Sequence, residues 1–135
     1  MLCWLLPYLF LMNPLMTTTD SKPIVGRWQG SCSGGYHDNL TYGAYEYEFT
    51  EDHKVTASMR YYMDPQCKGE GFDDGPKSEG SYTLSKRLSW TAQFRLRIDW
   101  EKGPKGFSRG VRFPKPSSLE LCDGLNCELF QKRSS

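Results

Sequence analysis

The stretch TAQFRLRIDW at residues 91–100 decides the fold class, because apolar and polar side chains alternate strictly along it. Its apolar positions are Ala92, Phe94, Leu96, Ile98 and Trp100. A period of two places these side chains on one face of a β-strand, whereas a helix would expose half of them. We therefore predict a strand with one buried face.

The same alternation recurs along the chain, between short segments rich in glycine, proline and acidic residues. It predicts seven more strands, at residues 24–32, 41–50, 55–63, 79–85, 107–113, 118–122 and 127–132. Residues 33–39 and 68–78 are predicted to be loops. Eight strands joined in sequence order favour an all-β fold, a closed antiparallel up-and-down barrel, with an open β-sandwich as the alternative.

The first nineteen residues carry no charged side chain, and residues 2–12 form an apolar run broken only by Pro7. We predict a signal peptide over residues 1–20 and one β-barrel domain over residues 21–135. A transmembrane anchor is the alternative, but the run is shorter than the twenty or so apolar residues of a span. The expected product is secreted or periplasmic, with no stable membrane span in the mature chain.

Removing the leader would leave four cysteines, an even number that favours two disulfides in an exported chain. Cys122 and Cys127 flank a four-residue turn between two predicted strands, so we expect them to bond across a hairpin. Cys32 then pairs with Cys67 by exclusion. A four-cysteine zinc site is the alternative, but the paired C-x-x-C spacing of zinc ribbons is absent.

The net charge of +1 hides an asymmetry along the chain. Residues 38–79 hold ten acidic against four basic side chains, and residues 86–115 hold nine basic against two acidic. We interpret the two halves as opposing parts of one sheet whose solvent faces pair in sign, and the alternative is a basic face for an anionic partner. The basic residues are spaced along alternating strands rather than clustered, which favours the first interpretation. We do not expect nucleic-acid binding.

The residues show no catalytic constellation. His37 and His53 are the only histidines and lie in polar turns, and Glu46 and Glu48 share the outer face of a predicted strand. The glycine- and aspartate-rich segment at residues 69–75 does not match a calcium loop. We therefore predict a binding protein rather than an enzyme, with no cofactor and no metal.

One group of motifs resembles the lipocalins and the wider calycin group. It consists of Gly26-x-Trp28 in the first strand, Cys32 soon after it, a tyrosine-rich second strand, and the sequence YYMDPQC at residues 61–67. The pattern is similar to small secreted lipocalin-like domains of bacterial hypothetical proteins and, more distantly, to the barrel domain of secreted Wnt antagonists. It covers Gly26 to about Trp100, and the chain has no room for the C-terminal helix that lipocalins often have.

The resemblance implies a small apolar or amphipathic, lipid-like ligand inside the barrel. The inward-facing side chains expected to bind it are Tyr45, Tyr47, Phe49, Met59, Tyr61, Phe94, Leu96 and Ile98. The resemblance also implies that Lys132 or Arg133 packs over Trp28 at the closed base. If the interior is packed instead, the alternative is a protein-binding or inhibitor module that uses the loops at residues 33–39 and 68–78.

Overall fold

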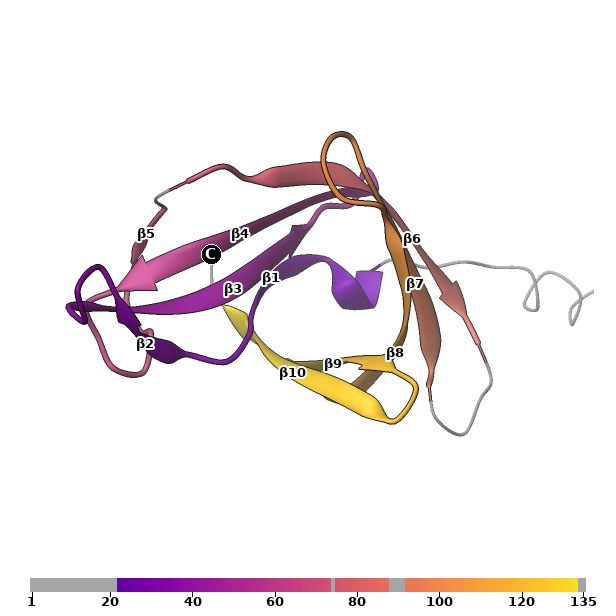
Figure 1. The fold of residues 1–135 in the computed structure, drawn as a ribbon. Helices are drawn as coiled ribbons and strands as arrows, with labels where there is room; N and C mark the ends of the chain where they lie inside the picture. Colours follow the sequence, from indigo (N-terminus) through magenta and orange to yellow (C-terminus); the bar gives the residue numbers. More distant parts are fainter. Residues whose placement is uncertain (1–21, 74, 88–91, 134–135) are drawn as a thin grey trace, which may run out of the picture.

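A computed structural model describes residues 22–73, 75–87 and 92–133, and these residues form an all-β structure (Figure 1). A single 3-10 turn, Lys22–Ile24, precedes the sheet in this part of the chain. The predicted signal peptide lies outside the described residues. The strands are β1 (Gly26–Gln29), β2 (Ser33–Tyr36), β3 (Thr41–Phe49), β4 (Lys54–Tyr62), β5 (Phe72–Asp73), β6 (Ser78–Lys86), β7 (Phe94–Trp100), β8 (Phe107–Lys115), β9 (Ser118–Asp123) and β10 (Asn126–Arg133).

Eight of these strands close into an antiparallel barrel, in the order β1, β10, β9, β8, β7, β6, β4, β3 and back to β1. The first strand pairs with the last, as predicted for a closed barrel, and Trp28 lies opposite Lys132 in this ladder. The closed barrel is therefore confirmed over the open sandwich. Closure leaves these eight strands without a free edge along the barrel wall.

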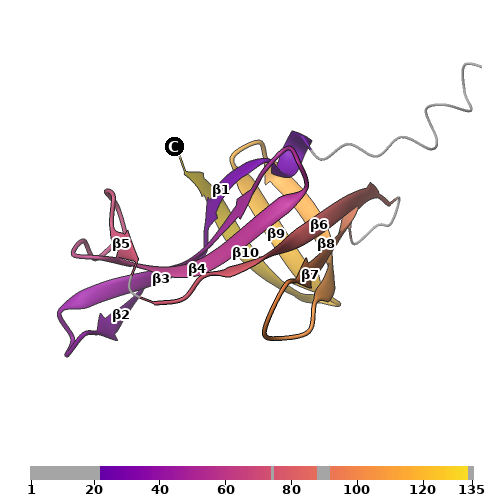
Figure 2. The same ribbon diagram turned by 90° about the horizontal axis from the view of Figure 1, so that it is seen from above.

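The two segments predicted as loops each contain a short strand. β2 pairs with the start of β3, and β5 pairs with the end of β4. Together with residues 41–45 of β3 and 59–62 of β4, they form a small sheet that we call the arm. Figure 2 shows the arm extending away from one end of the barrel.

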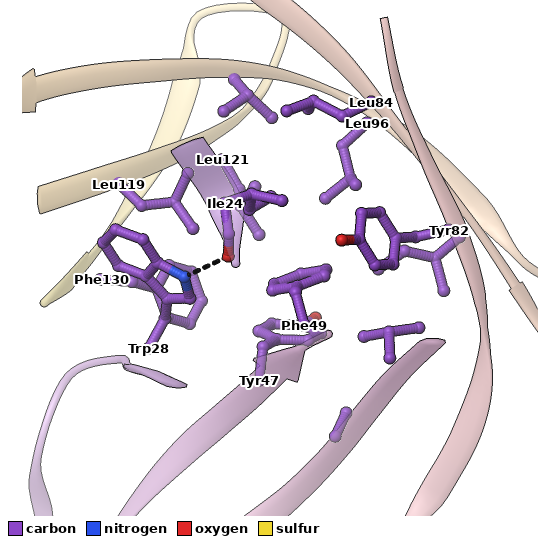
Figure 3. Packing of buried hydrophobic residues seen from close by; sticks show 14 residues of the cluster. Ile24, Trp28, Tyr47, Phe49, Tyr82, Leu84, Leu96, Leu119, Leu121 and Phe130 are labelled. Atoms are coloured by element: carbon purple, nitrogen blue, oxygen red, sulfur yellow. Dashed lines mark hydrogen bonds between the residues drawn. The ribbon is translucent and has the colours of Figure 1, made fainter. Parts of the chain in front are cut away.

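The barrel interior is filled by large apolar side chains rather than hollow along its length (Figure 3). The packed rings include Tyr47 stacked on Phe49 with centroids 5.7 Å apart, and Phe49 edge-on to Tyr82 at 5.0 Å. Fourteen buried side chains belong to this cluster, namely Ile24, Trp28, Tyr47, Phe49, Val55, Ala57, Tyr82, Leu84, Leu96, Ile98, Val111, Leu119, Leu121 and Phe130. The interior is thus mainly a folding core.

Trp28 closes the base of the barrel, the end next to the 3-10 turn. Its side chain is fully buried, and its indole N–H donates a hydrogen bond of 2.8 Å to the carbonyl of Ile24. The ammonium group of Lys132 lies 5.6 Å from the centre of the indole ring, within cation–π range. Of the two candidates, Lys132 therefore lies over Trp28.

The structure shows why the Gly-x-Trp pair requires glycine at position 26. Its φ of +135° is a conformation that side-chain-bearing residues rarely adopt. A Cβ atom at this position would also lie 2.9 Å from the Cε atom of Lys132. The glycine therefore allows Lys132 to cross the start of β1 on its way to Trp28.

Both predicted disulfides are present. Cys32 is bonded to Cys67, and Cys122 is bonded to Cys127 directly across the β9–β10 hairpin. All four cysteines of the described residues are therefore engaged in disulfides, which excludes the four-cysteine zinc site. Two disulfides indicate an oxidising, extracellular-type environment.

Candidate functional site: a cup at the open end of the barrel

The end of the barrel opposite Trp28 is open and holds a cup of about 320 Å³. Three elements build its wall, because β8 begins there and the β9–β10 hairpin turns there, while β3 passes on its way from the arm. The residues lining the cup are Tyr47, Phe107, Arg109, Leu121, Asp123, Asn126, Cys127 and Glu128. Its floor is the upper surface of the packed core, since Tyr47 and Leu121 belong to both.

Three charged residues, Arg109, Asp123 and Glu128, line this wall. Arg109 lies opposite the buried Leu96 in the β7–β8 ladder, and Glu128 lies opposite Leu121 in the β9–β10 ladder. Residues directly opposite each other in a ladder project from the same face. An otherwise apolar inner surface therefore becomes polar at its open end.

Arg109 is held in place by its neighbours. Its guanidinium lies 4.8 Å from the centre of the Phe107 ring and donates a hydrogen bond of 3.0 Å to the carbonyl of Ser108. Within the described residues it forms no ion pair with a carboxylate. The cation is thus satisfied mainly by an aromatic face and a backbone oxygen.

Two tyrosines at the rim, Tyr45 and Tyr47, lie close enough to Glu128 for its carboxylate to affect their pKa values. Burial raises the pKa of Tyr47 well above its usual value, and the neighbouring Tyr45 and Glu128 raise it further. Burial also raises the pKa of Tyr45, with Glu128 as the second cause. The two rings lie edge to face with centroids 5.2 Å apart. Both phenols are therefore neutral at physiological pH and stand close to a carboxylate.

The predicted ligand-binding residues do not all converge inside the barrel. Phe49, Leu96 and Ile98 are buried in the core, and Phe94 packs against the core near the base with its ring 5.6 Å from Phe113. Of the eight residues, Tyr47 alone lines the cup. Tyr45, Met59 and Tyr61 lie on the segments of β3 and β4 that form the arm, and they do not line the cup. Of the three, Tyr45 stands at the rim of the cup, with its ring against Tyr47.

The physical reason is that β3 and β4 are longer than the barrel wall. Their alternation continues beyond the open end, so Met59 and Tyr61 keep the inward parity but lie on the arm. Tyr45 lies at the boundary between arm and barrel, where its ring meets Tyr47. Met63 has the same parity and is 72% exposed. The alternation of a strand predicts which residues lie on the same face of the sheet. It does not predict where along the strand the barrel ends.

On the arm, aromatic side chains from both predicted loops gather around Tyr61. The rings of Tyr36 and His37 lie 5.3 Å and 4.6 Å from it, and Phe72 lies 5.8 Å from it. Phe72 remains 41% exposed. The two segments proposed as a protein-binding rim therefore lie together and form one surface, which we call the arm cluster.

A polar cluster on the outer face of β1, β3 and β4 was not anticipated from the sequence. Glu46 is buried there, where it accepts hydrogen bonds from the hydroxyl of Tyr62 and, at 3.0 Å, from the guanidinium of Arg27. Arg133 lies over the ring of Tyr62 and donates to the carbonyl oxygens of Cys67, at 2.8 Å, and Gly69. Alternation correctly placed Glu46 on the outer face, but it could not show that the segment following β4 covers that face.

The Tyr62 hydroxyl gives this cluster a defined response to pH. Burial, reinforced by the nearby Glu46 carboxylate, raises the pKa of Tyr62 from 10.0 to about 12. The unfolded chain therefore loses this proton first as pH rises, so the stabilisation from Tyr62 is complete below pH 10.0 and is lost towards pH 12.

We therefore expect Tyr62→Phe to lower the free energy of unfolding by about 1–3 kcal/mol near pH 8, because Glu46 loses a buried donor. The difference between the variant and the parent protein should shrink between pH 10.0 and 12, the interval between the two pKa values of Tyr62. Urea unfolding followed at several pH values measures both effects. A difference that stays constant up to pH 12 would contradict this assignment.

These features define an eight-stranded antiparallel β-barrel with a packed core, one closed base and one open, polar end. No protein-family model, curated protein or solved structure matches the chain. In the part of the chain that the structure describes, no helix is long and apolar enough to cross a membrane. The same described residues contain no group of three or more histidine, cysteine, aspartate or glutamate side chains that could hold a metal ion.

Proposed function

We propose that this chain is an exported, lipocalin-like binding protein that takes a small amphipathic molecule in the cup at the open end of its barrel. The observation that carries the proposal is that the inner surface of the barrel, apolar in the core, becomes partly polar at the open end. Along β8 the inward positions are Phe107, Arg109, Val111 and Phe113, so one cation stands among apolar residues at the level of the cup. Ligand sites combine apolar walls with a few polar groups in this way.

The size of the cup limits the ligand. About 320 Å³ lies at the lower end of the range for small-molecule sites, and the core below the cup is filled. A long acyl chain threaded down the barrel axis would displace Tyr47 or Leu121 from that core. We therefore favour a compact ligand whose apolar part rests on these two side chains.

Export is supported by the two disulfides and by the uncharged, apolar character of residues 1–19. The Gly26-x-Trp28 pair, with its cation from the last strand, supports the lipocalin-like assignment. In this proposal residues 1–20 are a signal peptide and the mature chain acts outside the cytoplasm.

The arm cluster favours a second candidate, a module that binds another protein. Its exposed aromatic surface is formed by the two segments at residues 33–39 and 68–78, and aromatic residues are enriched at protein interfaces. The two candidates use different surfaces. Phe72→Ser would abolish capture of a protein partner while leaving the cup unchanged.

Binding of the neutral fluorescent probe N-phenyl-1-naphthylamine tests the cup. We expect its emission to rise on addition of the protein, with saturable binding at one site. Leu121→Trp should fill the cup and weaken binding at least about tenfold, since the larger side chain occupies the probe's volume. Leu125→Trp is the matched control, because Leu125 is 94% exposed in the β9–β10 turn and does not line the cup. Equal binding by the two variants would refute the proposed site.

A further inference from the structure

The cup carries more negative than positive charge, and its carboxylates are not engaged. Glu128 and Asp123 line it together with the single cation Arg109. Within the described residues, neither carboxylate takes part in an ion pair or a side-chain hydrogen bond. Arg109, in contrast, is already held by the Phe107 ring and the Ser108 carbonyl. The groups left to bind a ligand are therefore the acceptors.

Aromatic rings stand beside these acceptors. Tyr47 forms part of the cup wall, Tyr45 meets it edge to face, and Phe107 lines the side next to Arg109. The face of an aromatic ring attracts a cation within about 6 Å of its centre. Burial raises the pKa values of Tyr45 and Tyr47, with the nearby Glu128 carboxylate as a further cause, so both phenols are neutral at physiological pH.

From this arrangement we infer that the ligand is an organic amine, a protonated ammonium group attached to a compact apolar or aromatic body. The inference rests on the proposed function of the cup and specifies its ligand class. The ammonium group binds between Glu128, Asp123 and the rim tyrosines, and the apolar body rests on Leu121 and Tyr47. Arg109 opposes an ammonium ligand and thereby disfavours ligands with more than one positive charge.

The test uses three probes that share an indole body and differ in charge, namely tryptamine, tryptophol and indole-3-propionate. Titration calorimetry on the mature, disulfide-bonded protein should show tryptamine binding about tenfold more tightly than the neutral tryptophol, with indole-3-propionate weakest. Glu128→Gln should remove most of the advantage of tryptamine and leave tryptophol binding unchanged. Arg109→Gln should increase the affinity for tryptamine.

The matched control is Glu120→Gln, because Glu120 lies on the outer face of β9, where it pairs with Arg112 at 3.3 Å. It should leave the preference for tryptamine unchanged. If the three probes bind equally, or if the acid binds best, the amine inference is wrong while the cup remains a binding site. If neither the indoles nor the neutral naphthylamine probe bind, the proposed function itself fails.

Discussion

Replacing Trp28 with alanine is expected to lower the free energy of unfolding by about 3–5 kcal/mol, the range for truncating a fully buried large aromatic side chain. The loss has three physical sources. The substitution opens a cavity beside Phe113, whose ring centre lies 6.1 Å from the indole, and it leaves the carbonyl of Ile24 without its donor. It also removes the surface that Lys132 covers. Urea unfolding followed by far-ultraviolet circular dichroism measures the change.

A second variant separates the cation from the ring. Lys132→Met keeps the apolar stem and removes the charge over the indole, so we expect a loss of about 0.5–1 kcal/mol, the range for an exposed cation–π contact. Leu125→Ala serves as the surface control and should stay within about 0.5 kcal/mol of the parent protein. A Trp28→Ala effect as small as that of Leu125→Ala would mean that the base is not closed by this residue.

Removing the Cys32–Cys67 disulfide is expected to have an effect of similar size. The bond joins residues 35 positions apart, and the chain-entropy model assigns about 4 kcal/mol to a loop of this length. The double substitution Cys32→Ala and Cys67→Ala should therefore unfold at much lower urea concentration. Because the bond crosses the outer face where Tyr42 and Ala44 pack, the arm should lose order before the barrel does.

The other disulfide supplies the matched comparison. Cys122 and Cys127 are only five positions apart, for which the same model gives about 2 kcal/mol. Cys122→Ala with Cys127→Ala should therefore be the milder pair. If the order of the two effects is reversed, the stabilisation comes from local packing at the hairpin rather than from restriction of the unfolded chain.

The strands were predictable because alternation is a local property. All eight strands of the barrel lie within a few residues of their predicted bounds, and β7 begins at Phe94 rather than at Thr91. Closure was predictable because an eight-stranded barrel must pair its first and last strands, which brought Trp28 and Lys132 together. The disulfides were predictable from the even number of cysteines after the predicted leader and from the short turn between Cys122 and Cys127.

The cup and the arm were harder to predict, because both depend on where the barrel wall ends. Arg109 and Glu128 are ordinary charged residues in the sequence, and their inward direction follows only from the observed ladders. Tyr61 kept the parity of Ala57, yet Ala57 is in the core and Tyr61 is on the arm. The length of a strand relative to its neighbours is a property of the whole sheet.

Arg133 links the two strands that close the barrel, β1 and β10, to the segment that follows β4. It belongs to the last strand, yet it binds the carbonyl of Cys67, and Cys67 is tied to Cys32 just beyond the first strand. A terminal strand of a closed barrel can peel away more easily than an internal one, since the chain connects it to its neighbours at one end only. Here β10 cannot separate from β1 without also releasing the segment that the disulfide anchors. The Arg133 contacts therefore reinforce the junction of the first and last strands beyond the hydrogen bonds of the β1–β10 ladder.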